Sequence, residues 1–318
     1  GASCGGCTMS ILESGASGWF DELRQSGIDL VWHPSVSEQT GDEVVELLEA
    51  IRDGRERLDL LVLEGSVARG PSLTGRFNML AGTNRSIYHW LLDLAPLADY
   101  VVAVGSCAAY GGIPAAGINP TDAVGLQFEG SDAGFRSKRG LPVINVAGCA
   151  PHPGWIMESL LALTSGDLAA DGLDTVGRPT FIANHLAHHG CSRNEFYEFK
   201  ASAETMSERG CLMEHLGCRA TQAVGDCNQR SWNGGGSCTK GGYACIACTS
   251  PGFESAQNYL ETAKLAGIPV GLPTDMPKAW FVALAALSKS ATPRRVRVNA
   301  TADHVVVPPG RPNDKRSP

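Results

Sequence analysis

Short apolar runs alternate with helical patterns along the first half of the chain. Four runs have the length and composition of strands, at residues 30–32, 58–63, 100–104 and 143–146. Apolar residues recur at helical spacing at 44–51, 87–94 and 157–163. The run at 58–63 is apolar almost throughout, which predicts a strand buried on both faces. The alternation predicts an α/β fold with a doubly wound, mostly parallel sheet.

The second half has a different character. Residues 184–252 show little periodicity and hold seven of the eleven cysteines. So long a stretch without regular structure is uncommon, but bound metal can replace a missing apolar core. Residues 164–179 are the expected connection. We therefore predict two domains, 1–165 and 180–318, the second irregular and rich in cysteine, with an extended tail after residue 291.

The apolar run at 276–287 comes nearest to a membrane span. It is shorter than the roughly 18 residues that a span needs, and it contains Lys278. We expect a buried or interface helix that begins at Pro277. No export signal is visible, so we expect a cytoplasmic location, with peripheral membrane attachment through a partner as the alternative.

The charge of the chain excludes one class of function. The net charge is −7, whereas broad binding of nucleic acid needs clustered Lys and Arg. The cluster Arg294, Arg295 and Arg297 is small and is expected to be a solvated surface stretch. We predict no nucleic-acid partner.

The number of cysteines points to metal binding. Eleven thiols cannot all pair within one chain, and the chain is far larger than small disulfide-dependent domains. Catalysis would account for one or two thiols only. Two pairs, Cys4/Cys7 and Cys245/Cys248, have the C-x-x-C spacing that lets two thiolates reach one metal centre.

The first ligand set follows from the predicted sheet. Cys107 and Cys149 each come just after a predicted strand, at the carboxyl edge where such sheets bind ligands. Cys4 and Cys7 lie in a Gly-rich loop before a helical segment. Cys4, Cys7, Cys107 and Cys149 together could hold one four-iron, four-sulfide cluster. The alternative is that Cys107 and Cys149 are ordinary buried cysteines.

The second set combines a histidine with three cysteines. His188 and Cys191 have H-x-x-C spacing, and Cys211 and Cys218 follow. A neutral imidazole in place of a thiolate makes a cluster site less negative and should raise its reduction potential. His185 and His189 compete with His188 for this role, and either could instead orient the ligand.

The remaining cysteines complete a third set. They are Cys227, Cys238, Cys245 and Cys248. The glycines before Cys238 would let the backbone bend tightly around a cluster. Eleven cysteines and His188 make twelve ligands, which suits three clusters of four. Several zinc sites are the rival interpretation, but they usually pair short spacings locally, and the first set spans a whole domain.

Seven segments, in order, resemble the small subunit of NiFe hydrogenases. They are SCGGCTMSILE, LEGSVARG, GSCAAYGGIPAAG, INVAGCAPHPGW, HLAHHGCSRNEFYEFKASAE, GCLMEHLGC and CNQRSWNGGGSCTKGGYACIACTSPGFE. The resemblance covers about residues 3–292 and includes all twelve proposed ligands. It implies a flavodoxin-like first domain followed by an iron–sulfur domain.

The resemblance also implies a role for each set. Cys4, Cys7, Cys107 and Cys149 match the ligands of the proximal cluster; His188, Cys191, Cys211 and Cys218 match those of the distal cluster; Cys227, Cys245 and Cys248 match those of the medial cluster. Glu64 matches a position near the proximal cluster. The catalytic Ni–Fe centre belongs to the large subunit, the implied partner, so no catalytic residue is expected in this chain.

Two departures from the family pattern concern the clusters. Many members have proline where this chain has Cys238, and their medial cluster has three irons. A fourth thiolate favours four irons here, although ligand count alone does not fix the iron count of any of the clusters. The two additional cysteines of oxygen-tolerant membrane-bound members are missing around Cys4 and Cys107.

The resemblance leaves two hydrogenase functions open. In an uptake enzyme, electrons from H2 oxidation pass through three clusters to a quinone, cytochrome or other carrier. In a regulatory sensor, the complex turns over slowly and signals to a histidine kinase. In either case we expect heterodimers that assemble further. A purely structural metal-binding protein is the third interpretation.

Overall fold

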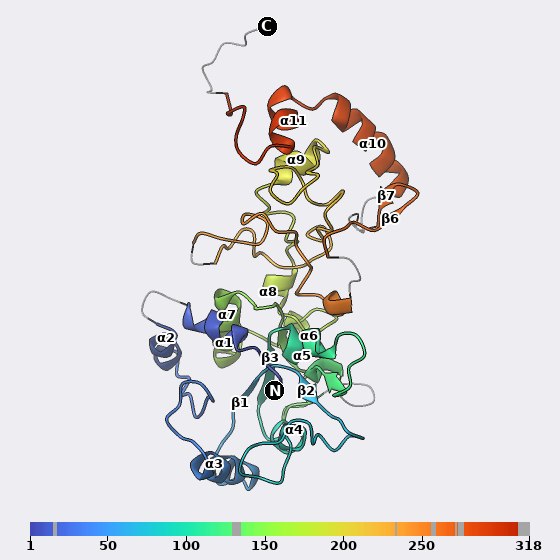
Figure 1. The fold of residues 1–318 in the computed structure, drawn as a ribbon. Coiled ribbons are helices and arrows are strands. Elements are labelled where there is room, and N and C mark those ends of the chain that lie inside the picture. Colours follow the sequence, from blue (N-terminus) through green and yellow to red (C-terminus); the bar gives the residue numbers. More distant parts are fainter. Residues whose placement is uncertain are drawn as a thin grey trace. The chain divides into compact units, whose positions relative to one another are not determined.

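The computed structural model describes residues 1–14, 18–128, 135–232, 234–255, 259–270, 272 and 277–310. The chain divides into two compact units (Figure 1). The first unit comprises Gly1–Asn184 and Cys248–Ser255, and the second comprises His185–Ala247 and Ala256–Pro318. The sequence-based ranges had put residues 248–255 in the second part, whereas their contacts are with the first unit.

A parallel sheet forms the centre of the first unit. Its strands are β1 (Leu60–Glu64), β3 (Tyr100–Val104) and β5 (Ile144–Val146), in the order β1-β3-β5. They confirm three of the four predicted strands. In the central strand β3, Val101 and Val102 are fully buried. The prediction that both faces of this strand are buried was wrong for β1, because β1 lies at the sheet edge and Val62 is 46% exposed.

The fourth predicted strand, at residues 30–32, is irregular in the structure. A strand is stable only when a neighbour supplies its backbone hydrogen bonds. Within the described residues, the strand ladder of this sheet ends at β1, and residues 30–32 pair with no strand. The apolar composition of this run was therefore insufficient to form one.

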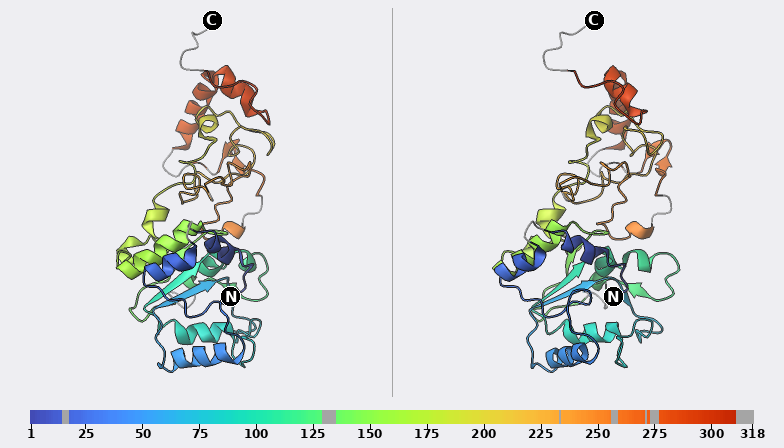
Figure 2. Two further views of the ribbon diagram at one scale, coloured as in Figure 1. Left: turned by 90° about the vertical axis from the view of Figure 1, so that its left-hand side faces the viewer. Right: turned by 60° about the vertical axis from the view of Figure 1, so that its left-hand side comes forward.

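Helices cover both faces of the sheet (Figure 2). On one face, α3 (Asp42–Arg52) and α4 (Ile87–Leu94) pack together, with Ile51 of α3 against Trp90 of α4. The Ser86 hydroxyl caps α4 by accepting the His89 amide. On the other face lie α1 (Gly6–Leu12), α2 (Trp19–Gln25) and α7 (Pro153–Ser165). This arrangement is the expected flavodoxin-like, doubly wound α/β fold.

Short elements complete the first unit. Strand β2 (Val67–Ala68) pairs antiparallel with β4 (Ala123–Val124). The short helices are α5 (Ser106–Tyr110), α6 (Gly112–Ala115) and α8 (Thr180–Ala183), with 3-10 turns at Leu126–Phe128, Ala170–Gly172 and Phe253–Ser255.

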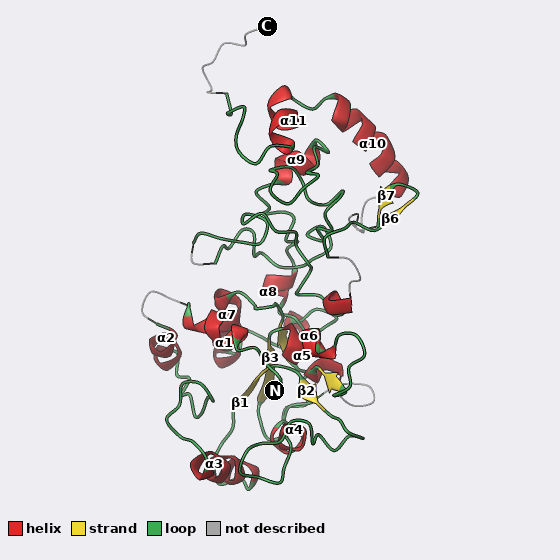
Figure 3. Cartoon of the chain, viewed as in Figure 1, coloured by secondary structure: helices red, strands yellow, loops and turns green. Residues whose placement is uncertain are grey.

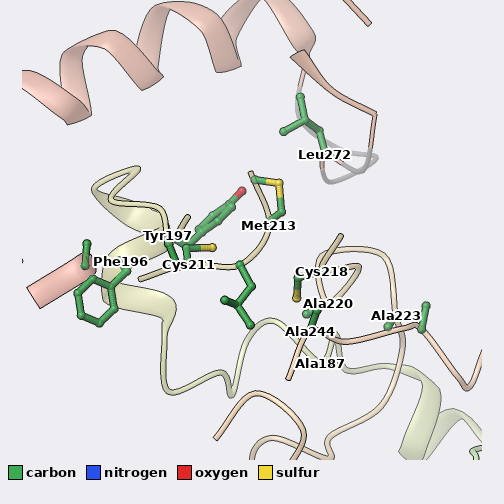
Figure 4. Packing of buried hydrophobic residues seen from close by; sticks show 14 of the residues in the cluster. Ala187, Phe196, Tyr197, Cys211, Met213, Cys218, Ala220, Ala223, Ala244 and Leu272 are labelled. Atoms are coloured by element: carbon green, nitrogen blue, oxygen red, sulfur yellow. The ribbon is translucent and has the colours of Figure 1, made fainter. Parts of the chain in front are cut away.

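The second unit is mostly loops and turns, as predicted (Figure 3). Its first part contains one short helix, α9 (Asn194–Glu198), among the described residues. A small hairpin, β6 (Lys264–Leu265) and β7 (Ile268–Pro269), precedes α10 (Lys278–Ser290) and α11 (Arg294–Ala300). Its core contains Tyr197, Leu212 and Met213 together with two of the predicted ligands, Cys211 and Cys218 (Figure 4).

One prediction for the C-terminal region needs correction. The tail is not simply extended, because α11 follows Pro293, and its Val296 is fully buried in the core of the second unit. The helix after Pro277 forms as predicted. Its Phe281 is buried in the core of the second unit, whereas Trp280 and Leu287 are 63% and 65% exposed, and the interface alternative stays a prediction. Met276 and the last prolines, Pro312 and Pro318, lie outside the described residues. None of the described helices has the length and apolar character to cross a membrane.

The burial of the central strand can be tested with a matched pair of substitutions. Val102 and Val62 are direct neighbours in the β1–β3 register, but only Val102 is fully buried. Val102→Ala should lower the free energy of unfolding by about 2–3 kcal/mol, since it leaves a cavity. Val62→Ala, the control, should change it by less than about 1 kcal/mol. Urea denaturation followed by circular dichroism measures both, and equal losses would contradict the edge position of β1.

Candidate metal centres

The first unit brings the first predicted ligand set together. Cys107 lies in α5, directly after β3, and Cys149 follows β5. Cys7 lies in the first turn of α1, and Cys4 precedes its N-cap, Gly5. Burial strongly raises the pKa of the Cys7 thiol, and the charges of Glu64, Cys107, Cys4 and Cys149 raise it further. The other three thiols of the set therefore influence the ionisation of Cys7.

Two glycines make room for these sulfurs. Gly105 has φ +90°, and a Cβ there would lie 2.4 Å from the Cys7 sulfur. Gly112 has φ +52°, and a Cβ there would lie 2.8 Å from the Cys107 sulfur. Both backbone conformations favour glycine. The space around the thiols thus depends on residues without side chains, as a site for a bulky inorganic group requires.

Backbone contacts fix the two ligand loops against each other. The Ser106 amide donates to the Gly148 carbonyl at 3.0 Å, and the Gly148 amide donates to the Ser106 hydroxyl, also at 3.0 Å. The Ser106 hydroxyl in turn donates to the carbonyl of Cys248. Ser106 therefore connects the loops of Cys107 and Cys149 with the returning segment that carries Cys248.

Glu64 lies beside the first set. Its carboxylate accepts the amides of Cys7 and Thr8 at 3.3 and 3.1 Å and the Ser3 hydroxyl at 2.6 Å. Burial opposes ionisation, but these hydrogen bonds and that of the Thr8 hydroxyl hold the pKa of Glu64 below its ordinary value. The carboxylate is thus ionised at neutral pH and orders the loop between Cys4 and Cys7.

The second predicted set lines one cavity of the second unit. His188, Cys191, Cys211 and Cys218 all face this hollow of about 320 Å³, which includes space open to solvent. The Cys191 amide donates to the His188 carbonyl at 3.0 Å, so a tight turn holds these two residues together. The donor set and the shared cavity fit an iron–sulfur cluster with one imidazole ligand.

The cavity distinguishes His188 from its two competitors. His185 and His189 are exposed, and neither lines the hollow. Burial, with smaller effects of His189 and Lys200, lowers the pKa of His188 to about 4. The imidazole is therefore neutral at physiological pH, which is the form that binds metal.

Backbone amides point at several of the sulfurs. The Arg193 amide donates to the Cys191 sulfur, and the Cys245 amide donates to the Cys218 sulfur, each at 3.4 Å. Burial raises the pKa of the Cys211 thiol to about 12. Without metal this thiol is protonated at neutral pH, so cluster binding has to displace its proton.

Arg193 was not recognised from the sequence. Its guanidinium donates to the carbonyls of Glu208 and Gly210, both at 2.6 Å, and of Thr239 at 3.1 Å. It thereby joins three loops around the cavity that it also lines. Only its place two residues after Cys191 could have singled it out.

The third set is divided between the units. Cys227, Cys238 and Cys245 belong to the second unit and Cys248 to the first. Burial raises the pKa of the Cys227 thiol to about 12, and the charge of Cys238 contributes. The medial set of four stays a prediction. Of its glycines, Gly234 has φ +67°, while Asn233 lies outside the described residues.

Within the described residues, no three His, Cys, Asp or Glu side chains surround a position for a single metal ion. A four-iron cluster makes a different demand, because each thiolate binds a different iron. The roles of the individual ligands stay predictions.

Two family comparisons cover most of the chain. Residues 4–163 match the family described as NADH ubiquinone oxidoreductase, 20 Kd subunit. Residues 184–261 match the family described as the C-terminal part of the NiFe/NiFeSe hydrogenase small subunit. The boundary between the two matches falls close to the end of Gly1–Asn184 in the first unit.

Individual relatives and solved structures agree with this assignment. The F420 non-reducing hydrogenase II small subunit of Methanosarcina mazei is 35% identical over 288 residues, covering 82% of this chain and 73% of that protein. The periplasmic NiFeSe hydrogenase small subunit of Desulfomicrobium baculatum is 30% identical, covering 83% and 85%. The actinobacterial-type NiFe-hydrogenase from Ralstonia eutropha H16 superposes with a TM-score of 0.72 at 28% identity, covering 93% of this chain and 90% of that one.

A NiFeSe hydrogenase from Desulfovibrio vulgaris Hildenborough superposes with a TM-score of 0.71 at 30% identity, covering 82% of this chain and 95% of that one. Family, relatives and structures all agree with the ordered ligand motifs. The chain therefore belongs to the small subunits of NiFe hydrogenases, the H2 oxidoreductases in which a small subunit that carries iron–sulfur clusters works beside a large subunit.

Proposed function

We propose that this chain is the electron-transfer small subunit of an uptake hydrogenase, which passes electrons from H2 oxidation to a carrier such as a quinone. The Ni–Fe centre would lie in the large subunit. Three bound iron–sulfur clusters would supply one-electron transfer. A cytoplasmic location and a higher oligomer of heterodimers stay predictions.

Contacts between the ligand sets carry the proposal. In the first unit, Ser106 connects the loops of Cys107 and Cys149 with the Cys248 carbonyl. In the second unit, the Cys245 amide bonds to the Cys218 sulfur. Cys245 and Cys248 belong to the same C-x-x-C motif. Each of the first two sets is therefore bonded, within its own unit, to a residue of the motif expected to serve the medial cluster, which supports a relay.

The chain's own residues have separate tasks in this proposal. Cys4, Cys7, Cys107 and Cys149 would hold the proximal cluster, and Glu64 would keep their loop ordered. His188, Cys191, Cys211 and Cys218 would hold the distal cluster, and Cys227, Cys238, Cys245 and Cys248 the medial one. Backbone amides that donate to ligand sulfurs favour their anionic form and help to set each potential.

An enzymatic role is favoured over a sensory one by the names of the relatives. The reported ones are described as F420 non-reducing and periplasmic hydrogenases. The two roles are distinguished by measuring steady-state H2 oxidation with a quinone analogue and by identifying co-purifying proteins. Rapid turnover supports uptake, whereas slow turnover with a bound histidine kinase would establish the sensor.

Metal and sulfide analysis tests the ligand count. The iron–sulfur clusters of the anaerobically purified complex should account for about twelve iron atoms and twelve acid-labile sulfides per small subunit, since each cubane has four of each. The Ni–Fe centre of the large subunit adds one further iron atom. Nickel should be present in the large subunit. About nine to eleven cluster irons, after subtraction of the iron of the Ni–Fe centre, would show that one or more clusters have three iron atoms. Zinc without sulfide would exclude the relay.

The exit end of the relay is tested by His188→Gly. This change should slow H2-dependent dye reduction by about tenfold or more, in line with the loss of a metal ligand or its close support. Exchange of H2 with D2O at the large subunit should persist. The control is His189→Gly, because His189 is exposed and does not line the cavity. Equal rates in the two variants would count against His188 as the ligand.

The first ligand set is tested by a pair of glycine substitutions. Gly105→Ala should reduce the iron content by about four atoms per chain, the content of one cubane, because the new Cβ would meet the Cys7 sulfur. Gly117→Ala is the control, since it also has positive φ but nothing lies within 4 Å of its Cβ position. Iron and sulfide analysis after anaerobic purification checks both variants. A full iron content in Gly105→Ala would show that the first cluster does not need the space that Gly105 leaves beside the Cys7 sulfur.

A further inference from the structure

Lys200 has a backbone conformation that favours glycine. Its φ is +53°, a left-handed value that carries an energetic cost for a residue with a side chain. The position follows the C-cap Phe199 of α9, and the Lys200 amide donates to the Tyr197 carbonyl at 3.0 Å. Glycine is the usual residue at such a helix end. A lysine here is best explained by what its side chain does.

The ammonium group of Lys200 lies over aromatic rings. It is 3.7 Å from the centre of the Tyr197 ring and 5.3 Å from that of Phe281. Both distances are within the range of cation–π attraction. Lys200 is half-buried, and among the described residues no carboxylate forms an ion pair with its ammonium. Burial lowers the pKa of Lys200 more than the nearby charges of Glu198 and Glu214 raise it.

Tyr197 lies between the Lys200 ammonium and the cavity that His188 lines. Its ring meets the His188 ring edge to face, with centroids 4.3 Å apart and planes at 68°. Tyr197 also lines the cavity beside Cys211 and Met213 (Figure 4). The carbonyl of Ala201, the residue after Lys200, accepts the Cys211 amide at 3.1 Å. Lys200 is thus connected to two predicted ligands, His188 through a ring and Cys211 through the backbone.

Two other cationic side chains of the second unit already bind carboxylate or carbonyl oxygens. Lys289 of α10 pairs with Glu214 at 3.2 Å. Arg193 donates to three carbonyls. Lys200 differs from both, because within the described part of the chain its ammonium contacts aromatic rings and forms no ion pair.

We propose that Lys200 and Tyr197 are positioning residues for the distal site: the Tyr197 ring orients His188, and the unpaired Lys200 charge favours the reduced state of the group that His188 binds. This inference rests on the proposed function, specifically on His188 as a ligand. A nearby cation stabilises an added electron by Coulomb attraction, and a half-buried site weakens solvent screening. The Lys200 charge would therefore favour electron transfer to the distal site, because it stabilises the reduced state of that site.

The test uses the intact heterodimer and three variants of Lys200. Lys200→Met removes the charge and keeps much of the length, Lys200→Arg keeps the charge, and Lys200→Gly removes the charge and relieves the positive φ. The first readout is a redox titration of the distal signal followed by electron paramagnetic resonance. The second is the temperature at which the heterodimer unfolds.

The charge predicts a pattern that a purely structural lysine would not give. In Lys200→Met and Lys200→Gly, the reduced-to-oxidised ratio at a fixed applied potential should fall about threefold to tenfold, as expected for removing a nearby charge that solvent screens only in part. Lys200→Arg should retain the wild-type ratio. Lys200→Gly should unfold at or above the wild-type temperature while showing the lowered ratio. An unchanged ratio in Lys200→Met and Lys200→Gly overturns the inference.

A labelling experiment separates this inference from the proposed function. Wild-type protein containing ¹⁵N-histidine should show nitrogen coupling in the distal signal. Coupling together with an unchanged ratio in Lys200→Met would retain the His188 ligand and reject the role of Lys200. Absence of coupling would reject His188 as the ligand and, with it, the positioning role of Tyr197 and Lys200.

Discussion

Convergence of sulfur donors from distant parts of the sequence is the constraint on which the rest of the structure depends. In the first unit, the parallel sheet brings the donors together. Cys107 and Cys149 follow the adjacent strands β3 and β5, and Cys4 and Cys7 lie just before and in the first turn of α1. In the second unit no sheet is available among the described residues around the cavity. Hydrogen-bonded turns and the Arg193 guanidinium hold the loops that surround it.

The second unit therefore has an unusual balance of stabilising interactions. Its core includes Cys211 and Cys218 among mainly small side chains such as Ala203 and Ala220. Such a core buries little apolar area for each residue that it orders, and conformational entropy opposes that ordering. Ligand bonds to a bound cluster would supply the missing stabilisation, as they do in other small metal-dependent folds. Folding of this half of the chain would thus be coupled to cluster binding.

Much of the fold could be predicted because the relevant signals are local. Residues 100–104 form a strand since a continuous apolar run suits burial on both faces. Residues 30–32 carry a similar signal but form no strand, because pairing depends on a neighbour that composition does not reveal. Helix α11 was missed because its arginines and the surrounding prolines obscured the spacing of Val296, Asn299 and Ala300, which are buried.

The candidate sites, like the fold, could be predicted from the sequence only in part. Spacing and the sheet edge were enough to group the cysteines, but they left His185, His188 and His189 as competitors. Only the cavity distinguished among them, since His188 alone of the three lines it. Gly105 and Arg193 act through close approach and long side-chain reach. Neither property depends on sequence distance, so no spacing rule could have identified them.

The return of Cys248–Ser255 to the first unit has a consequence for the integrity of the two halves. Arg178 donates to the Thr249 carbonyl at 2.9 Å, so this short segment is bonded to residues that precede it by some seventy positions. The chain leaves the first unit, comes back and leaves again. Neither unit is a single contiguous segment, and a break after Asn184 would deprive the first unit of part of its own structure. Synthesis of the first unit is complete only after the first part of the second unit, His185–Ala247, has been made.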